Sequence, residues 1–303
     1  MKAWSLLMAL AILTCFTACA ADAPSEEELA KIRDAAPEKP TVQPEQPRQL
    51  LVFSLVPTGY VHSAIPYGKA AVQAIAEKTG AFEVTITDDI AVFEPESLAR
   101  FDAVFFNNAN NELFLPPDFN ELEDTAKKEA LARDARLKQS LAGFIQGGKG
   151  VGLLHAALAT FREWEEWGDI VGGRFDNHPW NKEVTLRVDD PDHPLTAAFP
   201  EPAFKITDEI YQVTGPYSRE THRVLLSLDY ESAGEANAGE VNREDKDFAL
   251  AWVKPYGEGR VFYCGLGHYH ELFWDPQVLR FLLDGIQFTL GDLDADMTPS
   301  AKL

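Results

Sequence analysis

The sequence has very little cysteine. Of the three cysteines among its 303 residues, Cys15 and Cys19 lie in an apolar N-terminal segment, and Cys264 stands alone in the rest of the chain. A single cysteine cannot form an intramolecular disulfide, so a disulfide framework is excluded. Cys264 ends the apolar run VFYC, which is typical of a buried core side chain rather than a reactive thiol.

Positive charge is also scarce. The chain has 27 Lys and Arg residues against 48 Asp and Glu residues, giving a formal net charge of −21. Nucleic acid and anionic lipid surfaces both require a basic surface for binding, so neither is expected as the main partner.

Several well-known catalytic motifs are missing. The sequence has no G-x-S-x-G elbow, no G-x-G-x-x-G after its first predicted strand and no complete P-loop. Hydride transfer and nucleotide hydrolysis therefore lack support, and we expect no nucleotide cofactor. H-E-x-x-H is absent too, so any metal site must be assembled from residues far apart in the sequence.

Long apolar runs are limited to one short stretch near the N-terminus. Residues 4–16 follow Lys2 and are too few to span a bilayer, which is typical of a signal peptide. The sequence FTAC at residues 16–19 resembles a bacterial lipobox, which predicts residues 1–19 as a lipoprotein signal and Cys19 as the lipidated residue. Ordinary cleavage at the small residues ACA is the alternative. Either route predicts an exported protein, periplasmic or anchored in the outer membrane by lipid alone.

The remaining chain divides into three predicted parts. Residues 20–48 are acidic and rich in proline, which predicts a disordered tether. Residues 49–292 form the predicted folded domain, and residues 293–303 a C-terminal tail. Within the domain, residues 121–138 are charged with a helical period, so we expect a solvated helical insertion.

Short apolar runs alternate with helical patterns through the predicted domain. Residues 51–55, 101–106 and 151–154 are typical of strands buried on both faces, and residues 66–78 and 276–290 are typical of helices. Strands alternating with helices predict βαβ units and a mostly parallel sheet. Residues 172–180 have little periodicity and predict a loop, while residues 256–259 predict a hairpin turn.

Four histidines share a distinctive setting in the sequence. Each lies in a predicted loop or at a predicted strand end, flanked by glycine or proline: His62, His155, His178 and His268. Ligands of open α/β sheets bind outside the carboxyl ends of the strands. These histidines, with the acidic pair Asp208 and Glu209, therefore predict a shared polar site.

Two chemistries fit such a site. Imidazole and carboxylate groups are preferred ligands of zinc and related divalent metals, which predicts a metal centre built from His155, His178 and His268 with Glu209 or Asp208. The alternative is metal-free acid–base catalysis by a histidine and Glu209. In both cases His155, Glu209 and Asp208 are the predicted catalytic residues.

An ordered set of motifs across residues 49–292 resembles the ThuA-like (trehalose-utilisation) family. The matching segments are HS at 62–63, GGKGVGLLHAA at 147–157, HP at 178–179, DEIY at 208–211 and GRVFYCGLGH at 259–268. The resemblance implies an α/β fold, the flavodoxin-like three-layer sandwich of the class I glutamine amidotransferases. It also implies that His155 occupies the position of their nucleophilic cysteine. Thioester chemistry is excluded there, so a glutamine amidotransferase is not expected.

The same resemblance implies a link with carbohydrate catabolism, especially of oxidised (keto) disaccharides or glycosides. We therefore expect a sugar-active hydrolase, lyase or isomerase whose partner is a small carbohydrate. His62, Trp180, Tyr211 and Tyr269 are the predicted substrate-binding residues, since aromatic rings could stack on a sugar. The alternative is a non-catalytic carbohydrate-binding or scaffold lipoprotein.

Overall fold

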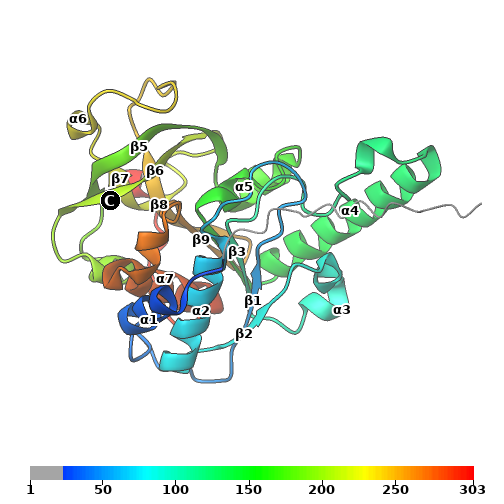
Figure 1. Ribbon diagram of the computed structural model, residues 1–303, viewed down its shortest axis with the longest axis horizontal. Coiled ribbons are helices and arrows are strands. Elements are labelled where there is room, and N and C mark those ends of the chain that lie inside the picture. Colours follow the sequence, from blue (N-terminus) through cyan, green and yellow to red (C-terminus); the bar gives the residue numbers. More distant parts are fainter. Residues whose placement is uncertain (1–22) are drawn as a thin grey trace, which may run out of the picture.

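The computed structural model describes residues 23–303, which fold around one large mixed sheet (Figure 1). Its nine strands are β1 (Gln49–Phe53), β2 (Glu83–Ile86), β3 (Ala103–Asn107), β4 (Gly150–Leu154), β5 (Arg174–Val188), β6 (Ala203–Thr214), β7 (Arg223–Leu228), β8 (Ala249–Tyr256) and β9 (Gly259–Cys264). The α-helices of this part are α1 (Glu26–Ala35), α2 (Ile65–Thr79), α3 (Pro95–Leu98), α4 (Asp124–Gln146), α5 (Glu165–Val171), α6 (Tyr230–Ala233) and α7 (Pro276–Leu290).

The sheet has a parallel half and an antiparallel half. Its strand order is β2-β1-β3-β4-β9-β8-β7-β5-β6, and every pair from β2 to β9 is parallel. Every pair from β9 to β6 is antiparallel. The expected α/β class is confirmed, but the expectation of a mostly parallel sheet holds for only half of it. The predicted tight turn at residues 256–259 joins β8 to β9, and such a turn can join only antiparallel neighbours.

Helices cover both faces of the parallel half (Figure 1). Alternate strand residues point to opposite faces, so Leu50 and Val52 pack with helices α2 and α7, whereas Leu51 and Phe53 pack with α3, α4 and α5. Burial on both faces explains why these strands have continuous apolar sequences. In α4 the buried side chains lie in its second half, from Asp134 onward, and its first half projects from the body as expected for a solvated insertion.

The segment before β1 is ordered rather than the flexible tether that its composition predicts. Helix α1 begins with a capping box between Ser25 and Glu28, and Ile32 is 1% exposed. Further along, the Gln287 side chain accepts the backbone N–H of Thr41 at 2.7 Å and of Val42 at 3.2 Å. A single apolar stripe is enough to dock a short helix on the domain. The composition of the helix nevertheless remains polar, because most of its other residues are charged.

Helix α1 provides a direct test of this docking. We expect Ile32→Ala to lower the free energy of unfolding by about 2 to 4 kcal/mol, because it removes a buried aliphatic side chain and leaves a cavity. Leu131→Ala, in the projecting part of α4 where Leu131 is 48% exposed, should change it by no more than about 0.5 kcal/mol. Urea denaturation of both variants measures the difference. If Ile32→Ala were as stable as the unaltered protein, helix α1 would not be anchored to the domain.

The predicted loop at residues 172–180 is also different in the structure. Strand β5 begins at Arg174, and its pairing with β6 shifts register between Phe175 and Asn177 and again between Asn177 and Trp180. These irregularities disrupt the period-2 alternation by which a strand is identified in sequence.

Among residues 23–303, no helix combines the length and the apolar character that crossing a membrane requires.

Candidate functional site

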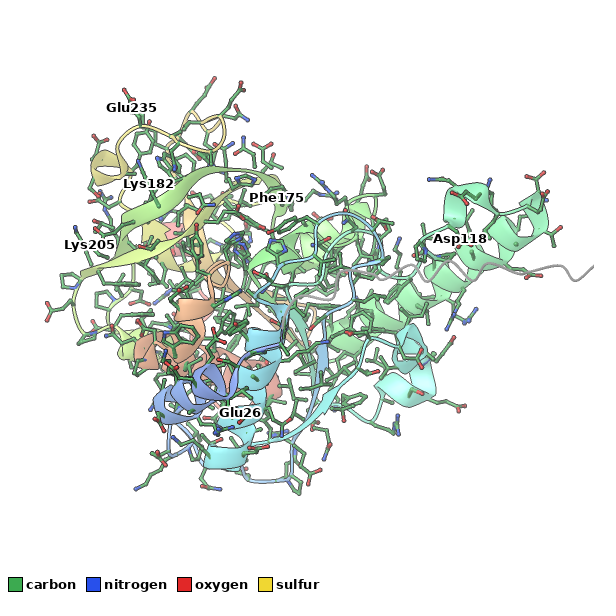
Figure 2. The ribbon with its side chains drawn as sticks, viewed as in Figure 1. Glu26, Asp118, Phe175, Lys182, Lys205 and Glu235 are labelled. Carbon is green, nitrogen blue, oxygen red and sulfur yellow. The ribbon has the colours of Figure 1, made fainter. Side chains whose placement is uncertain are left out.

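The carboxyl ends of the parallel strands bring the candidate residues together. His62 lies in the segment after β1, Asn108 directly follows β3, His155 directly follows β4, and His268 follows β9. The long β5–β6 pair adds Glu209 to the same place, since a Glu209 carboxylate oxygen lies 3.3 Å from His155 Nε2. In Figure 2 this pair extends from Phe175, near the middle of the molecule, towards Lys182 and Lys205.

His155 is fixed by its backbone and by one hydrogen bond. Its φ of +46° is in the left-handed region, which costs about 1 to 3 kcal/mol for a non-glycine residue and is typical of functional sites. Its side chain is fully buried, and Nδ1 lies 2.7 Å from the carbonyl oxygen of Gly265. A carbonyl can only accept, so Nδ1 carries a hydrogen, and in the neutral ring Nε2 has the free lone pair.

His268 lies on a turn that Asp208 holds. The backbone N–H groups of Gly267 and His268 donate to the two carboxylate oxygens of Asp208 at 2.9 and 3.1 Å. Gly267 has a φ of +137°, which favours glycine at this turn. The His268 ring then points Nδ1 at Glu209 Oε2, 3.2 Å away. Burial alone would lower the pKa of His268, but the adjacent Glu209 carboxylate raises it overall.

Asp208 is therefore a positioning residue, not one of the catalytic groups predicted from sequence. Its side chain is fully buried and its carboxylate oxygens are occupied by backbone N–H groups. Successive strand residues point to opposite faces, so only one member of the Asp208–Glu209 pair can face the site. That member is Glu209.

His62 completes the group of rings. Its ring centroid lies 5.4 Å from those of both His155 and His268, at nearly perpendicular orientations. Burial, followed by the nearby His155 and His268, lowers the pKa of His62 to about 3. The imidazole is therefore neutral at physiological pH, which is the form that binds metals.

Both carboxylate oxygens of Glu209 face imidazole nitrogens. Oε2 faces His155 and His268, while Oε1 lies 3.5 Å from Nδ1 of His178. Burial would raise the pKa of Glu209, but the adjacent His155 and His268 imidazoles outweigh it and hold the pKa well below its usual range. The carboxylate is therefore ionised, as a metal ligand or a general base must be.

The geometry of this group fits a divalent metal ion. Ligand atoms of His62, His155, His268 and Glu209 all lie within 4.8 Å of one another. Zinc–ligand distances of about 2.0 to 2.1 Å in a tetrahedron place neighbouring ligand atoms roughly 3.3 Å apart. The distances from Glu209 Oε2 to the His155 and His268 nitrogens are 3.3 and 3.2 Å. His62 thus takes the place that the sequence analysis gave to His178, whose side chain is 40% exposed.

A cavity of about 490 Å³ opens onto the histidine group. Residues from six parts of the chain line it, among them Tyr60, His62, Asn110, Asn111, Arg162, Phe175, His178, Asn181, Glu209, Tyr211 and His268. The Tyr211 ring lies 4.3 Å from the His155 ring, so the predicted substrate residue Tyr211 does reach the site. Tyr269 is one step removed, since its hydroxyl donates to the side chain of Asn181, which lines the cavity.

Trp180 is not part of the site, contrary to the sequence prediction. Its side chain is fully buried, its ring packs at 5.0 Å from Phe248 and 6.0 Å from Tyr230, and its indole N–H donates to the Gly234 carbonyl. The irregular pairing between Asn177 and Trp180 separates the indole from His178. Cys19, the predicted lipidation site, lies outside the described residues.

The sequence analysis missed Arg162, Asn110, Asn111 and Asn181 as cavity residues. The asparagine signal was present, because the run NNANN at residues 107–111 begins at the last residue of β3. Asn108 and Asn111 have φ values of +52° and +66°, a conformation that asparagine tolerates better than most residues. Asn108 also accepts the Ala156 N–H and donates to the Gly267 carbonyl, so it connects the two histidine-bearing turns.

Comparisons with known proteins agree with this architecture. A ThuA-like protein from Bacteroides uniformis superposes with a TM-score of 0.56 at 20% identity, covering 84% of this chain and 93% of that one. A ThuA-like protein from Parabacteroides merdae gives 0.53 at 16% identity, covering 83% and 93%. At these identities the likeness concerns the fold alone. No curated protein matches in sequence. The family model ThuA, described as trehalose utilisation, matches residues 49–289, and the chain therefore belongs to the ThuA family.

Proposed function

We propose that this protein is a sugar-active enzyme whose centre is a divalent metal ion bound by His62, His155, His268 and Glu209. The observation that carries the proposal is the meeting of three imidazoles on one ionised carboxylate at the end of a cavity. The family's description as trehalose utilisation supports a carbohydrate substrate. An oxidised (keto) sugar or a glycoside suits the proposed chemistry best.

The hydrogen bonding of His155 supports a metal rather than a simple ion pair. In the neutral ring Nε2 has a lone pair and no hydrogen, yet it lies 3.3 Å from a carboxylate oxygen and has no hydrogen-bond partner. Nδ1 of His268 and of His62 also lack a hydrogen-bond partner. A cation between these atoms would satisfy all of them. The Gly265 carbonyl that accepts from His155 Nδ1 is the kind of outer contact that orients metal-binding histidines.

A divalent metal in this position would act as a Lewis acid towards a carbonyl or hydroxyl oxygen of the sugar. His178 is placed to move a proton, because its half-exposed ring faces the cavity and its Nδ1 lies 3.5 Å from Glu209 Oε1. Asn110, Asn111 and Asn181 offer amide groups to sugar hydroxyls, and Tyr211 and Phe175 offer apolar ring surface.

Two finer proposals accompany this one. The parallel strands follow the doubly wound order 2-1-3-4-5 if β9 is counted fifth, which supports a flavodoxin-like, class I glutamine amidotransferase-like core. The N-terminal sequence supports export, with Cys19 as the lipid attachment point and a periplasmic or outer-membrane location.

Metal analysis tests the central proposal. After chelation and reloading with Zn²⁺ or Mn²⁺, the protein should hold one equivalent per chain by mass spectrometry of the elements. His155→Ala should lower the affinity by at least about 100-fold, since even outer-shell changes cost 10- to 100-fold. His270→Gln is the matched control, because His270 contacts Ser63 and Tyr67 outside the group.

Absence of stoichiometric binding in the unaltered protein would overturn the metal centre. Turnover is assayed on keto-disaccharides and keto-glycosides with the same three proteins, and His155→Ala should abolish it. A protein that binds both metal and sugar but turns none over would instead be a carbohydrate-binding protein, the alternative function.

A further inference from the structure

The candidate cavity carries little negative charge for a chain whose net charge is −21. Among its lining residues Glu209 is the single carboxylate, and it is engaged by His155 and His268. The other polar side chains include the neutral amides of Asn110, Asn111 and Asn181. The cavity is thus a place where an anionic group would meet no free carboxylate.

Arg162 is the single arginine or lysine that lines this cavity. Its side chain is exposed, and its guanidinium lies over the Phe175 ring, 5.7 Å from the ring centroid. Within residues 23–303 no carboxylate pairs with it, although Glu163 is its neighbour in sequence. Seven other arginines of this part do pair with carboxylates: Arg48, Arg136, Arg187, Arg219, Arg223, Arg243 and Arg280.

A continuous row of rings connects Arg162 with the histidine group. The Phe175 ring lies 4.5 Å from the Tyr211 ring, and the Tyr211 ring lies 4.3 Å from the His155 ring. A ligand lying along these rings would have one end at His155 and Glu209 and the other end at Arg162. The cation–π contact occupies one face of the guanidinium and leaves its in-plane N–H donors available.

We propose that Arg162 binds a carboxylate on the substrate, so that the cavity accepts sugar acids, such as uronic acids, in preference to neutral sugars. This inference deepens the proposed sugar-active function and rests on it. A planar guanidinium matches a carboxylate with two parallel hydrogen bonds, and one such group neutralises one negative charge. The one arginine of the cavity therefore fits a monoanionic sugar.

Calorimetric titration with D-glucuronate and D-glucose tests the inference. At low salt the protein should bind glucuronate about tenfold more tightly than glucose, because a charge-assisted pair replaces a neutral contact. Arg162→Gln should remove this preference, lowering the affinity for glucuronate about tenfold relative to that for glucose. Arg133→Gln is the matched control, since Arg133 has no ion pair and lies on helix α4, lining a different cavity. It should keep the full preference.

The titrations are made on chelated and on Zn²⁺-loaded protein, because a carboxylate can also bind a metal directly. A preference that persists in Arg162→Gln, or its absence from the unaltered protein, would contradict the role of Arg162. Failure of the metal proposal is distinguishable from failure of the Arg162 proposal, because in that case neither the unaltered protein nor either variant would take up zinc. Arg162→Gln itself should take up zinc as the unaltered protein does.

Discussion

Glu209→Gln is expected to lower the affinity for a divalent metal by at least about 100-fold and to abolish sugar turnover. The substitution keeps the size of the side chain but removes the charge that three imidazoles face. An amide nitrogen cannot ligate the metal, and its two hydrogens would compete for the same imidazole lone pairs. Loss of a direct ligand should cost more than the 10- to 100-fold typical of outer contacts.

The metal-free protein offers a second readout of Glu209→Gln. Burial lowers the pKa of His268, but the adjacent Glu209 carboxylate raises it overall, so this pKa should fall when the carboxylate is removed. NMR titration of the imidazole signals measures the change without any metal or substrate. Glu183→Gln is the matched control, because Glu183 lies on β5, exposed and paired with Lys205. An unchanged metal affinity in Glu209→Gln would exclude this carboxylate from the centre.

The sequence predicted the parallel half of the sheet well for a physical reason. Strands β1, β3 and β4 are buried on both faces, so each is a continuous apolar run that no charged residue interrupts. The location of His155 followed from the same argument, since it directly follows β4. His268 was placed similarly, because it lies shortly after Cys264, the last residue of strand β9.

The errors in the site have equally specific causes. The segment between β1 and α2 is a loop, and its sequence does not encode that His62 would lie beside His155 and His268, where the sequence analysis had expected His178. Trp180 was misplaced because the irregular pairing in β5 changes which residues share a face. Helix α1 was missed because one buried isoleucine is concealed by a charged composition.

The second large effect is expected from Asp208→Ala, which should lower the free energy of unfolding by about 3 to 5 kcal/mol. The substitution leaves the backbone N–H groups of Gly267 and His268 without an acceptor in a buried place, at about 1 to 3 kcal/mol each, and leaves a cavity. Urea denaturation measures the loss. Asp192→Ala is the control, because Asp192 is exposed in a turn, and it should change stability by no more than about 0.5 kcal/mol.

Asp208→Ala should also weaken metal binding, by about 10- to 100-fold, although Asp208 is not one of the proposed ligands. The reason is positional: its two hydrogen bonds hold the turn from which His268 points at Glu209. Asp208→Asn should be intermediate in both measurements, because an amide oxygen accepts one of the two N–H groups and the amide nitrogen opposes the other. A folded Asp208→Ala variant with unaltered metal affinity would show that the His268 turn is held by other contacts, such as the one from Asn108.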